Sequence, residues 1–340
     1  MKKIKILSAV LALMLMLCSC SNGPEAATGG KYMLATGKAG GTYYSLGTSL
    51  ASVWDKYSQS TTNITTTSGS VQNIEMLLKN NADFAFVQSD ILHYALEGKE
   101  MYEENPQKGL SVVANLYSEH AQFVVNASSG IQTIPELAGK TVAVGKYGTA
   151  TEAAARQILE AYGITYDMIT VKYQTFSEAM DGLHSGSIQA AFAVSSLPSA
   201  NILEYSQTHE IRFLPISLTQ SAAFKRSCPF FRDGMILNEV YGTKNSVSTV
   251  CIDVLLICRN VASSADVLAI TQSIFNNVDE VTAGHAKGTE INVVTAAETL
   301  VGQIHSGARQ YYENGGEIPQ KEESSKPEES SSSEQSSENE

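Results

Sequence analysis

The sequence predicts an α/β protein of two lobes, with mixed, mostly parallel sheets flanked by helices and a two-stranded hinge between the lobes. The chain has 340 residues, which suits two hydrophobic cores better than one. Short apolar runs alternate with segments of helical periodicity, and this alternation is typical of parallel sheets with right-handed crossovers. The alternation starts again near residue 130, and the segments 118–126 and 247–258 lead from one unit to the other. A pair of crossing segments permits closure over a ligand.

The first strand, loop and helix contain the stretch LATGKAGGTYYSLGTSL. An apolar run at 32–35 fits a buried strand, a loop with several glycines follows, and from Thr42 onwards Leu46, Leu50 and Val53 recur at helical spacing. The first turn of such a helix leaves backbone N–H groups without partners, and together with the helix dipole they attract an anion. Glycines alone fit an ordinary turn equally well, but the hydroxyl side chains crowded into this turn favour an anion site, for example for a carboxylate.

Two further loops of the first unit follow strands in the same way. A run of strand-forming residues at 63–67 ends in Ser68-Gly69-Ser70, and Ser70 is the expected N-cap of the helix that follows, up to residue 78. A buried strand at 83–87 ends in Gln88-Ser89-Asp90, before a helix over 91–95. Because ligands bind beyond the carboxyl ends of parallel strands, we expect the three loops to converge.

Four side chains near these loops are individual candidates. Tyr43 and Tyr44 are adjacent in a helix and cannot face the same way, so we expect Tyr43 to face the cleft. Gln88 and Tyr117 each stand at a strand end and are candidates for ligand contact. Asp90 fits either a contact to an amine or a cap of its own helix.

The second unit repeats the pattern. Strands are expected at 111–117, 122–126, 141–144, 169–172, 189–194 and 248–258, and helices at 134–140, 151–162, 176–184, 198–206, 264–283 and 297–312. Residues 145–151 form a second loop of glycines and hydroxyls before a helix, and Gly163 is expected just after that helix ends. These assignments give a first lobe of residues 31–120 and 250–318 and a second lobe of residues 121–249.

The two ends of the chain have a different character. Residues 1–20 begin with lysines, continue with a short apolar run and end in Leu17-Cys18-Ser19-Cys20, which resembles the lipobox of bacterial lipoproteins. We therefore expect cleavage before Cys20, a lipid on Cys20 that holds the protein at the membrane, and a flexible tether over 21–30. The alternative is a secreted protein that is cut elsewhere. Residues 319–340, rich in Ser and Glu, are expected to be disordered.

Charge and motifs argue against several functions. The net charge is −12, which disfavours nucleic acid, and the acidic tail supplies much of it. The sequence has neither the H-E-x-x-H nor the G-x-S-x-G motif, so we expect no catalytic residues; His93 and His120 fit surface or capping roles. Cysteines 228, 251 and 258 lack metal-ligand spacing, and we expect no metal or cofactor; a disulfide from Cys228 to one of the others stays open.

Several motifs together resemble one family. They are TGKAGGTYYSLG, SGSVQNIEMLLKNNADFAFVQSD, SSGIQTIPELAGKTVAVGKYGTATEAAARQILEAYGI and GARQYYENG. In order and spacing they resemble the TAXI family, the extracytoplasmic solute-binding proteins of TRAP transporters, from about residue 32 to residue 318. The resemblance implies a type II periplasmic-binding-protein fold, no catalysis, a monomer, and delivery of a small carboxylate or amino acid such as glutamate to an ion-gradient-driven membrane permease.

The resemblance also implies the ligand contacts. With the strand-end candidate Tyr117, the expected contacts are Gly40, Gly41, Thr42, Tyr43, Ser68, Ser70, Gln88, Ser89, Tyr117, Gly148, Thr149 and Thr151. Two departures from the family pattern are Gly37-Lys38, where the family has paired glycines, and Ser195-Ser196 before Leu-Pro, where it tends to have glycines. Lys38 can either add a positive charge at the anion site or point into water. The hydroxyls of the two serines can either contact the ligand or only fill space.

Two other functions remain open at this point. A lipid-anchored sensor for a signalling partner would have the same sequence features, and a TRAP-type permease encoded beside the chain would favour transport. A hydrolase on the same fold would turn over its bound ligand.

Overall fold

A computed structural model describes residues 29–315 of the chain. The predicted signal peptide, the Cys20 that is expected to carry a lipid, most of the expected tether and the expected acidic tail lie outside the described residues. In the described part no helix is long and apolar enough to cross a membrane. Cysteines 228, 251 and 258 are buried free thiols, so the structure contains no disulfide among them.

Ten strands form one mixed sheet. The strands are β1 (Lys31–Ala35), β2 (Thr61–Thr65), β3 (Phe84–Gln88), β4 (Leu110–Asn126), β5 (Thr141–Gly145), β6 (Thr170–Tyr173), β7 (Ala190–Ser195), β8 (Ile211–Phe213), β9 (Phe231–Ile236) and β10 (Val247–Arg259). Their order is β2-β1-β3-β10-β4-β7-β5-β6, with β8 on β4 and β9 on β10. The pairs β1–β2, β1–β3, β5–β6 and β5–β7 are parallel, and every pair that includes β4 or β10 is antiparallel.

Helices flank this sheet. They are α2 (Thr42–Ser58), α3 (Ser70–Leu78), α4 (Ser89–Glu97), α5 (Ala150–Ala161), α6 (Phe176–Ser185), α7 (Ala200–Ser206), α8 (Leu218–Phe224), α9 (Asn238–Tyr241), α10 (Ser264–Phe275), α11 (Val278–Gly284), α12 (Val293–Ala296) and α13 (Ser306–Glu313). Short 3-10 turns are η1 (Glu100–Tyr102), η2 (Ala127–Ser129), η3 (Ile134–Leu137), η4 (Tyr166–Met168) and η5 (Ala286–Glu290). The predicted α/β class with a mixed, helix-flanked sheet is confirmed.

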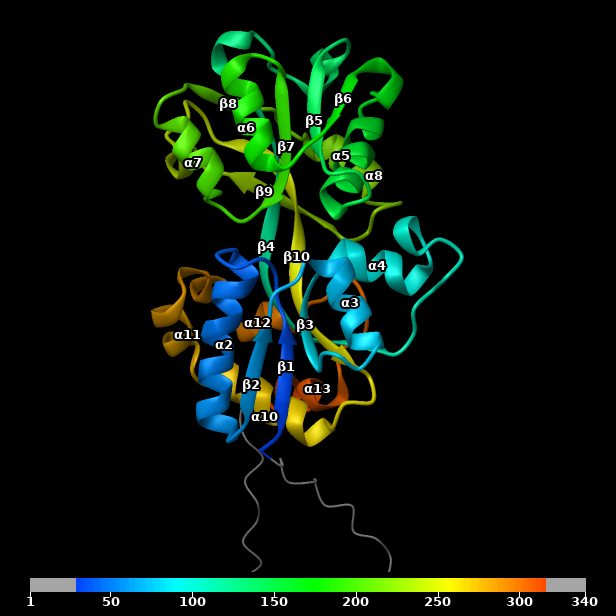
Figure 1. Ribbon diagram of the computed structural model, residues 1–340, viewed down its shortest axis with the longest axis vertical. Coiled ribbons are helices and arrows are strands. Elements are labelled where there is room, and N and C mark those ends of the chain that lie inside the picture. The colour runs from blue at the N-terminus through cyan, green and yellow to red at the C-terminus, as the bar shows by residue number, and fades with distance from the viewer. Residues whose placement is uncertain (1–28, 316–340) are drawn as a thin grey trace, which may run out of the picture.

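The molecule consists of two bodies stacked along its long axis (Figure 1). We call lobe 1 the body with β1–β3, α2–α4 and α10–α13, and lobe 2 the body with β5–β8 and α5–α9. The long strands β4 and β10 run through both, side by side and antiparallel (Figure 1). The sheet is therefore continuous from lobe 1 to lobe 2 through this pair of strands.

The connection is more regular than the sequence predicted. The apolar pattern of β4 is interrupted at Ser118, Glu119 and His120, which is why the sequence analysis split it into two strands. The backbone ladder continues through this interruption, with Ser118 opposite Asp253 and His120 opposite Cys251 on β10. Polar side chains thus occupy the middle of a strand without breaking it.

Some predicted elements differ from the structure. The helix expected over 264–283 is divided, because Asn277 has non-helical backbone angles and begins α11. The prediction of a helix over 297–312 is wrong for its first half, since α13 begins only at Ser306. There the backbone N–H of Val112 and of His305 bond to the carbonyls of Gln303 and Val112, at 2.8 Å each, so the chain is extended beside β4. Five short helices and strands of the described chain were not predicted at all: β8, α8, β9, α9 and α12.

Two predictions about helix ends have opposite outcomes. Gly163 follows the last residues of α5 with φ +73°, as expected for a glycine just after a helix. Ser70 is not the N-cap of α3: it is the first helical residue, and Gly69 occupies the cap position with φ 120°. The Ser70 hydroxyl instead accepts a hydrogen bond from the backbone N–H of Gln88, at 3.0 Å, which ties α3 to the end of β3.

The core of lobe 1 fixes the direction of α2. Leu46, Leu50 and Trp54 lie on one face of this helix and are fully buried, and Trp54 packs against Phe84 of β3 with ring centroids 5.6 Å apart. Burying a side chain such as leucine contributes about 1.5–3 kcal/mol. The start of α2 is thereby held at the end of lobe 1 that faces lobe 2 (Figure 1).

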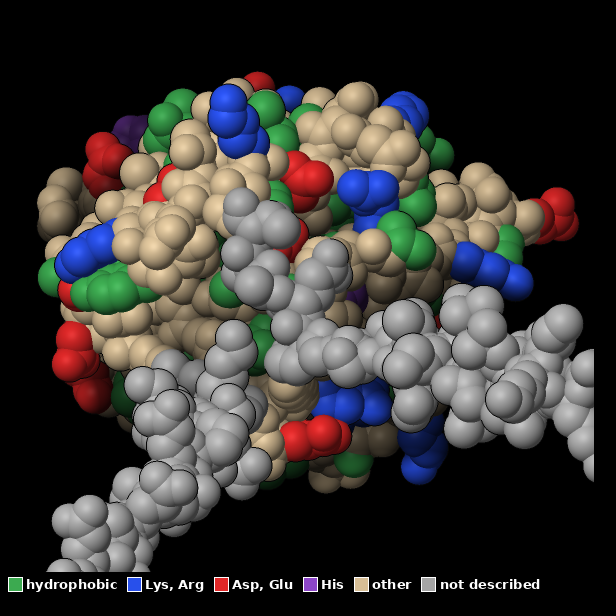
Figure 2. Space-filling model, turned by 90° about the horizontal axis from the view of Figure 1, so that it is seen from below, with side chains coloured by type: hydrophobic (Ala, Val, Ile, Leu, Met, Phe, Trp, Pro, Cys, Tyr) green, Lys and Arg blue, Asp and Glu red, His purple; other side chains and the backbone are tan. Residues whose placement is uncertain are grey.

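The outer end of lobe 1 is seen in Figure 2. Acidic, basic and apolar side chains are interspersed over the visible face, without one extended patch of a single kind. Both ends of the described chain, at residues 29 and 315, lie at this end of the molecule, away from lobe 2 (Figure 1).

Candidate functional site

A cleft of about 740 Å³ lies between the lobes, beside the β4–β10 connection. Lobe 1 contributes the loop before α2, the start of α3 and the end of β3. Lobe 2 contributes the loop before α5, the turn before α6 and the end of β7. The carboxyl ends of parallel strands from both lobes thus face one space, as the sequence analysis expected for the loops of lobe 1.

The first turn of α2 presents free backbone N–H groups. Gly41 is the N-cap, with extended backbone angles and no side-chain cap. Within the described residues, the N–H groups of Thr42, Tyr43 and Tyr44 have no hydrogen-bond acceptor, while that of Gly41 donates to the carbonyl of Lys38 at 2.9 Å. Gly41, Thr42 and Tyr43 line the cleft. This helix end therefore has the geometry of an anion site.

The first turn of α3 is built in the same manner. Gly69 is its N-cap, again without a side-chain cap, and no atom lies within 4 Å of the place where a Cβ would stand. The backbone angles of Gly69, φ 120° and ψ −160°, belong to a region that essentially only glycine adopts. Ser68, Gly69 and Ser70 line the cleft, so a second helix N-terminus opens into it.

A buried asparagine holds these loops together. Asn73 is fully buried, and its amide donates to the carbonyls of Thr36 and Phe86, at 2.7 Å each. Its oxygen accepts from the Thr67 hydroxyl at 2.7 Å, and that hydroxyl oxygen also accepts from the backbone N–H of Gly69 at 3.1 Å. The loops after β1, β2 and β3 are thus fixed relative to one another by a single polar network.

A carboxylate stands in the cleft wall at the middle of β4. Glu119 accepts a hydrogen bond from the amide of Gln88 at 2.7 Å and from the hydroxyl of Tyr117 at 3.3 Å. Burial raises the pKa of the Glu119 carboxyl to about 7, although these bonds and the charge of Lys287 act in the opposite direction. The sequence analysis did not select Glu119, although an acid inside the apolar run of a central strand was a usable signal.

Asp90 belongs to the helix rather than to the cleft wall. It is fully buried, and its Oδ1 accepts from the backbone N–H of Ile91 at 2.7 Å, so it satisfies a donor in the first turn of α4. Its Oδ2 has no partner in the part of the chain that the structure describes. Burial, together with the nearby charge of Glu119, raises the pKa of Asp90 to about 7. Of the two roles considered for Asp90, the structure shows the contact within its own helix.

Lobe 2 faces the cleft with hydroxyls that are partly engaged. Thr149 is the N-cap of α5: its hydroxyl donates to the carbonyl of Lys146 at 2.7 Å and accepts from the N–H of Glu152 at 3.4 Å. Across the cleft, the hydroxyls of Thr42 and Ser196 are 3.3 Å apart and join the two lobes. Gln174 also lines the cleft, and its Oε1 is buried without a partner among the described residues.

The structure brings most of the expected contact residues together. Those that line the cleft are Gly41, Thr42, Tyr43, Ser68, Ser70, Gln88, Gly148, Thr149 and Thr151. Gly40 is exposed on the loop outside the cleft wall. Ser89 is buried and lies 3.5 Å from the carbonyl of Phe230, and Tyr117 is buried behind Glu119. These three residues do not line the cleft.

Tyr43, Lys38 and the two serines can now be placed. Tyr43 lines the cleft as expected, and its ring stacks on Phe86 with centroids 5.3 Å apart. Lys38, Ser195 and Ser196 line the cleft too, and the Lys38 side chain is exposed. The sequence analysis missed further lining residues of lobe 2: Lys146, Gln174, Phe176, Phe192 and Asn201.

The expectation for the two histidines is wrong. His93 packs against Phe230 with ring centroids 5.4 Å apart, and His120 stands beside Gly234 in the connection between the lobes. Burial lowers the pKa of both, to about 4 for His120. Both are half-buried packing residues, because β9 and the loop before it, which were not predicted, cover them.

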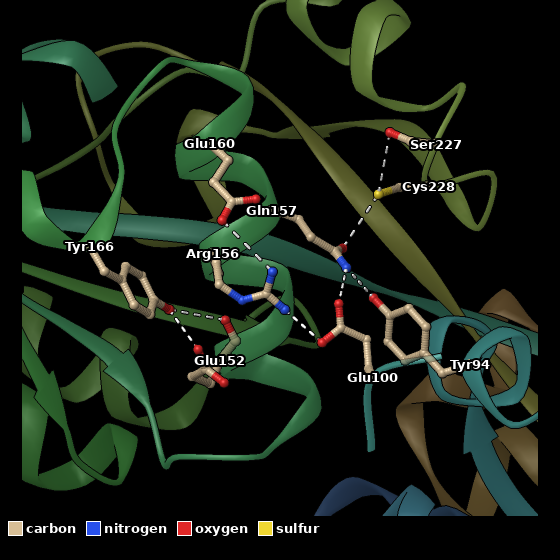
Figure 3. A network of polar contacts seen from close by, with 9 residues as sticks. All are labelled: Tyr94, Glu100, Glu152, Arg156, Gln157, Glu160, Tyr166, Ser227 and Cys228. Atoms are coloured by element: carbon tan, nitrogen blue, oxygen red, sulfur yellow. Dashed lines mark hydrogen bonds and ion pairs between the residues drawn. The ribbon is translucent and has the colours of Figure 1, made fainter. Parts of the chain in front are cut away.

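A polar network joins the lobes on the side of α4 and α5 (Figure 3). Arg156 of α5 pairs with Glu100 of η1 at 2.6 Å, and Gln157 donates to the hydroxyl of Tyr94 at 2.7 Å. The Cys228 thiol donates to the Gln157 oxygen at 3.5 Å. We call Tyr94, Glu100, Arg156 and Gln157 the interlobe latch, because lobe 1 supplies the first two and lobe 2 the others.

Lobe 2 has a second hollow of about 770 Å³, between residues 206–213 and 241–248. Its wall belongs to one lobe only, and the described helices that reach it, α7 and α9, do so with their last residues, Ser206 and Tyr241. The interlobe cleft is the better candidate, because two longer helices begin there with free N–H groups.

Three solved structures have a similar fold. PhnD1 from Prochlorococcus marinus (MIT 9301), in complex with methylphosphonate, has a TM-score of 0.52 at 9% identity and covers 77% of this chain and 91% of its own. MatC from Rhodopseudomonas palustris, with bound malate, has a TM-score of 0.51 at 10% identity, with 76% and 88% covered. XAC2383 from Xanthomonas citri, bound to ATP, has a TM-score of 0.50 at 10% identity, with 84% and 94% covered.

These likenesses agree with the α/β architecture described above. The sequence gives a closer relationship: the model of the NMT1-like family matches residues 34–316, well over half of the chain. The protein therefore belongs to the NMT1-like family.

Proposed function

We propose that this protein is an extracytoplasmic solute-binding protein that captures a small carboxylate-bearing solute between its lobes. One observation carries the proposal: α2 and α3 both begin with a glycine cap, and both open into the same interlobe cleft. Among the described residues, the first-turn N–H groups of both helices, at 42–44 and 70–72, have no acceptor. Two helix N-termini favour a negatively charged group at this place. The malate of MatC and the methylphosphonate of PhnD1 are anions as well, which supports an acidic solute here.

The solute binds in two steps in this proposal. Its carboxylate first accepts hydrogen bonds from the N–H groups of Thr42 and Tyr43 and from the hydroxyls of Ser68 and Ser70. Hydrogen bonds to a charged group contribute roughly 1.5–3 kcal/mol each. Lobe 2 then closes over the solute through the β4–β10 connection and brings the loop at Thr149 and Thr151 to it. Closure follows binding only if the solute prefers the closed state.

The resemblance of the motifs to the TAXI family gives the setting. We propose that the protein is held at the membrane by a lipid on Cys20, acts as a monomer, and delivers its solute to a TRAP-type permease. Residue 29 lies at the outer end of lobe 1, so a tether from the membrane would leave the cleft and lobe 2 accessible (Figure 1). Lobe 1 and lobe 2 correspond in this proposal to residues 31–120 with 250–318 and to residues 121–249.

Isothermal titration with a panel of carboxylates, amino acids and phosphonates tests the binding site. We expect binding of an acidic solute, and a loss of about 100-fold or more when Ser68 and Ser70 are both changed to alanine, since two hydroxyl groups that donate to the charged carboxylate are removed. Thr48→Ala on the exposed side of α2 is the matched control and should bind as the native protein does. Unchanged affinity in the double variant would exclude the hydroxyls of Ser68 and Ser70 as part of the anion site.

A second measurement tests the class of function. Mass spectrometry of the solute after long incubation should recover it unchanged, whereas a hydrolase would convert it. Solute uptake by vesicles that contain the permease should require the binding protein; uptake that does not depend on it would contradict the transport role.

A further inference from the structure

The cleft contains one acid with no cation beside it. Of the described residues that line the cleft, Glu119 is the only acidic one, while Lys38 and Lys146 stand at its rim with exposed side chains. Glu119 is 8% exposed. It forms no salt bridge within residues 29–315. A buried carboxylate without a positive partner is costly for the fold, so its presence in a ligand cleft calls for an explanation.

The hydrogen bonds of Glu119 are those of an ionised carboxylate. One oxygen accepts from the Gln88 amide at 2.7 Å, and the other accepts from the Tyr117 hydroxyl at 3.3 Å. Both neighbours donate, and such bonds favour the charged form of an acid. The surroundings are therefore arranged for a negative charge that the protein itself does not neutralise.

The charged groups around Glu119 do not supply the missing partner. Lys287 lies over the Tyr117 ring, 5.6 Å from its centroid, and its charge lowers the pKa of Glu119, but its ammonium is bonded to Glu290 and forms no ion pair with Glu119 among the described residues. Asp90 of α4 adds a like charge, and its Oδ2 is itself buried without a partner in the described chain. The remaining titratable neighbour is Tyr43 of α2, whose pKa is raised well above its usual value by burial and by Glu119.

We propose that Glu119 is the counter-ion for a positively charged nitrogen of the solute, so that the cleft selects zwitterionic amino acids over simple carboxylic acids. This inference rests on the proposed function and deepens it. The helix N-termini of α2 and α3 hold the carboxylate of the solute, and Glu119 holds its ammonium group. The negative charge of Glu119 then lies beside the positive ammonium group of the solute. The protein supplies no such positive partner for Glu119, and a dicarboxylate solute would not supply one either.

Binding has a proton signature if this assignment is correct. Burial raises the pKa of Glu119 to about 7, so at pH 6 a large part of these side chains carries a proton. An ammonium group beside Glu119 stabilises the ionised form and releases that proton to the buffer. A solute without an ammonium group has the opposite effect, because its carboxylate disfavours the charge on Glu119.

The experiment compares pairs of solutes that differ only in the amino group: L-glutamate with glutarate, and L-aspartate with succinate. Titration calorimetry at pH 6 in buffers of different ionisation enthalpy measures affinity and proton transfer together. We expect at least one amino acid to bind about 100-fold more tightly than its partner acid, with net proton release, because truncating one member of a buried charge pair has effects of this size. Glu119→Gln keeps the shape and removes the charge, and should abolish both the preference and the proton release.

The outcomes separate this inference from the proposed function. Glu298 lies on the opposite side of the β4–β10 connection, outside the cleft, so Glu298→Gln is the matched control and should retain the preference. Tight binding of glutarate or succinate, with no preference for the amino acids, overturns the role of Glu119 and leaves the carboxylate site intact. Binding of neither set overturns both. If the Glu119→Gln variant does not fold, the native protein alone tests the role of Glu119: proton release when an amino acid binds supports it, and no proton release overturns it.

Discussion

The interlobe latch should control how far the lobes open. Changing Arg156 and Gln157 of α5 to methionine removes the two contacts to Glu100 and Tyr94 and keeps the helix and the side-chain length (Figure 3). Both changed residues lie outside the cleft wall. An effect of the double variant on solute binding must therefore act through the equilibrium between open and closed lobes.

The size of the expected change in the closed-to-open ratio follows from how far the side chains of the latch are exposed to solvent. The side chains of Arg156 and Glu100 are each 29% exposed, so solvent screens the ion pair and its contribution is about 1 kcal/mol. The bond from Gln157 to the largely buried Tyr94 adds about 1 kcal/mol. Together, about 2 kcal/mol corresponds to a shift of about 30-fold in the ratio of closed to open molecules. Solute affinity should weaken by up to the same factor.

The assay measures the distance between spin labels on cysteines introduced at Thr66 of lobe 1 and Lys172 of lobe 2, which are both exposed. The thiols of Cys228, Cys251 and Cys258 are buried and should not react. Glu160→Gln is the control, because this side chain also pairs with Arg156 but lies in lobe 2. We expect longer and broader distances in the double variant only. Distances equal to those of the native protein would refute the reasoning, and so would an equal change in the Glu160→Gln control.

Three further predictions concern the lobe 1 side of the cleft and its surroundings. Asn73→Leu should lower the free energy of unfolding by about 2–4 kcal/mol in urea denaturation, because it leaves several buried polar groups without partners; a loss below 1 kcal/mol would contradict the role of this network. Gly69→Ala should cost about 1–3 kcal/mol by the same measurement, since φ is 120° there while the space is open, and an unchanged value would mean that the loop relaxes. The pKa of Asp90 is raised to about 7, so between pH 4 and pH 7 the folded protein holds a proton that the unfolded chain has lost, and stability should fall as pH rises through this range. Asp90→Asn should make that fall smaller, and an unchanged slope would show that Asp90 does not titrate there.

The sequence was sufficient for the elements with strong local signals. Helical spacing from Thr42, the serine and glycine loop before α3, and the alternation of short strands and helices all act over neighbouring residues. The rule that ligands bind at the carboxyl ends of parallel strands then placed nine of the expected contacts in one cleft. The short elements between residues 207 and 246 had no such local signal, because each has only three to seven residues.

The tertiary structure decided what depends on distant partners. Glu119 looks like a polar interruption in the sequence, and only the approach of Gln88, 31 positions away, shows it as a held carboxylate in the cleft wall. Ser70 looks like a helix cap, but its hydroxyl is used by the end of β3. The sequence by itself determined two α/β units and the loops that line the cleft, because periodicity and glycine act locally. Which charges lie in the cleft and how the lobes are latched came only from the fold, because those contacts join residues that the chain keeps far apart.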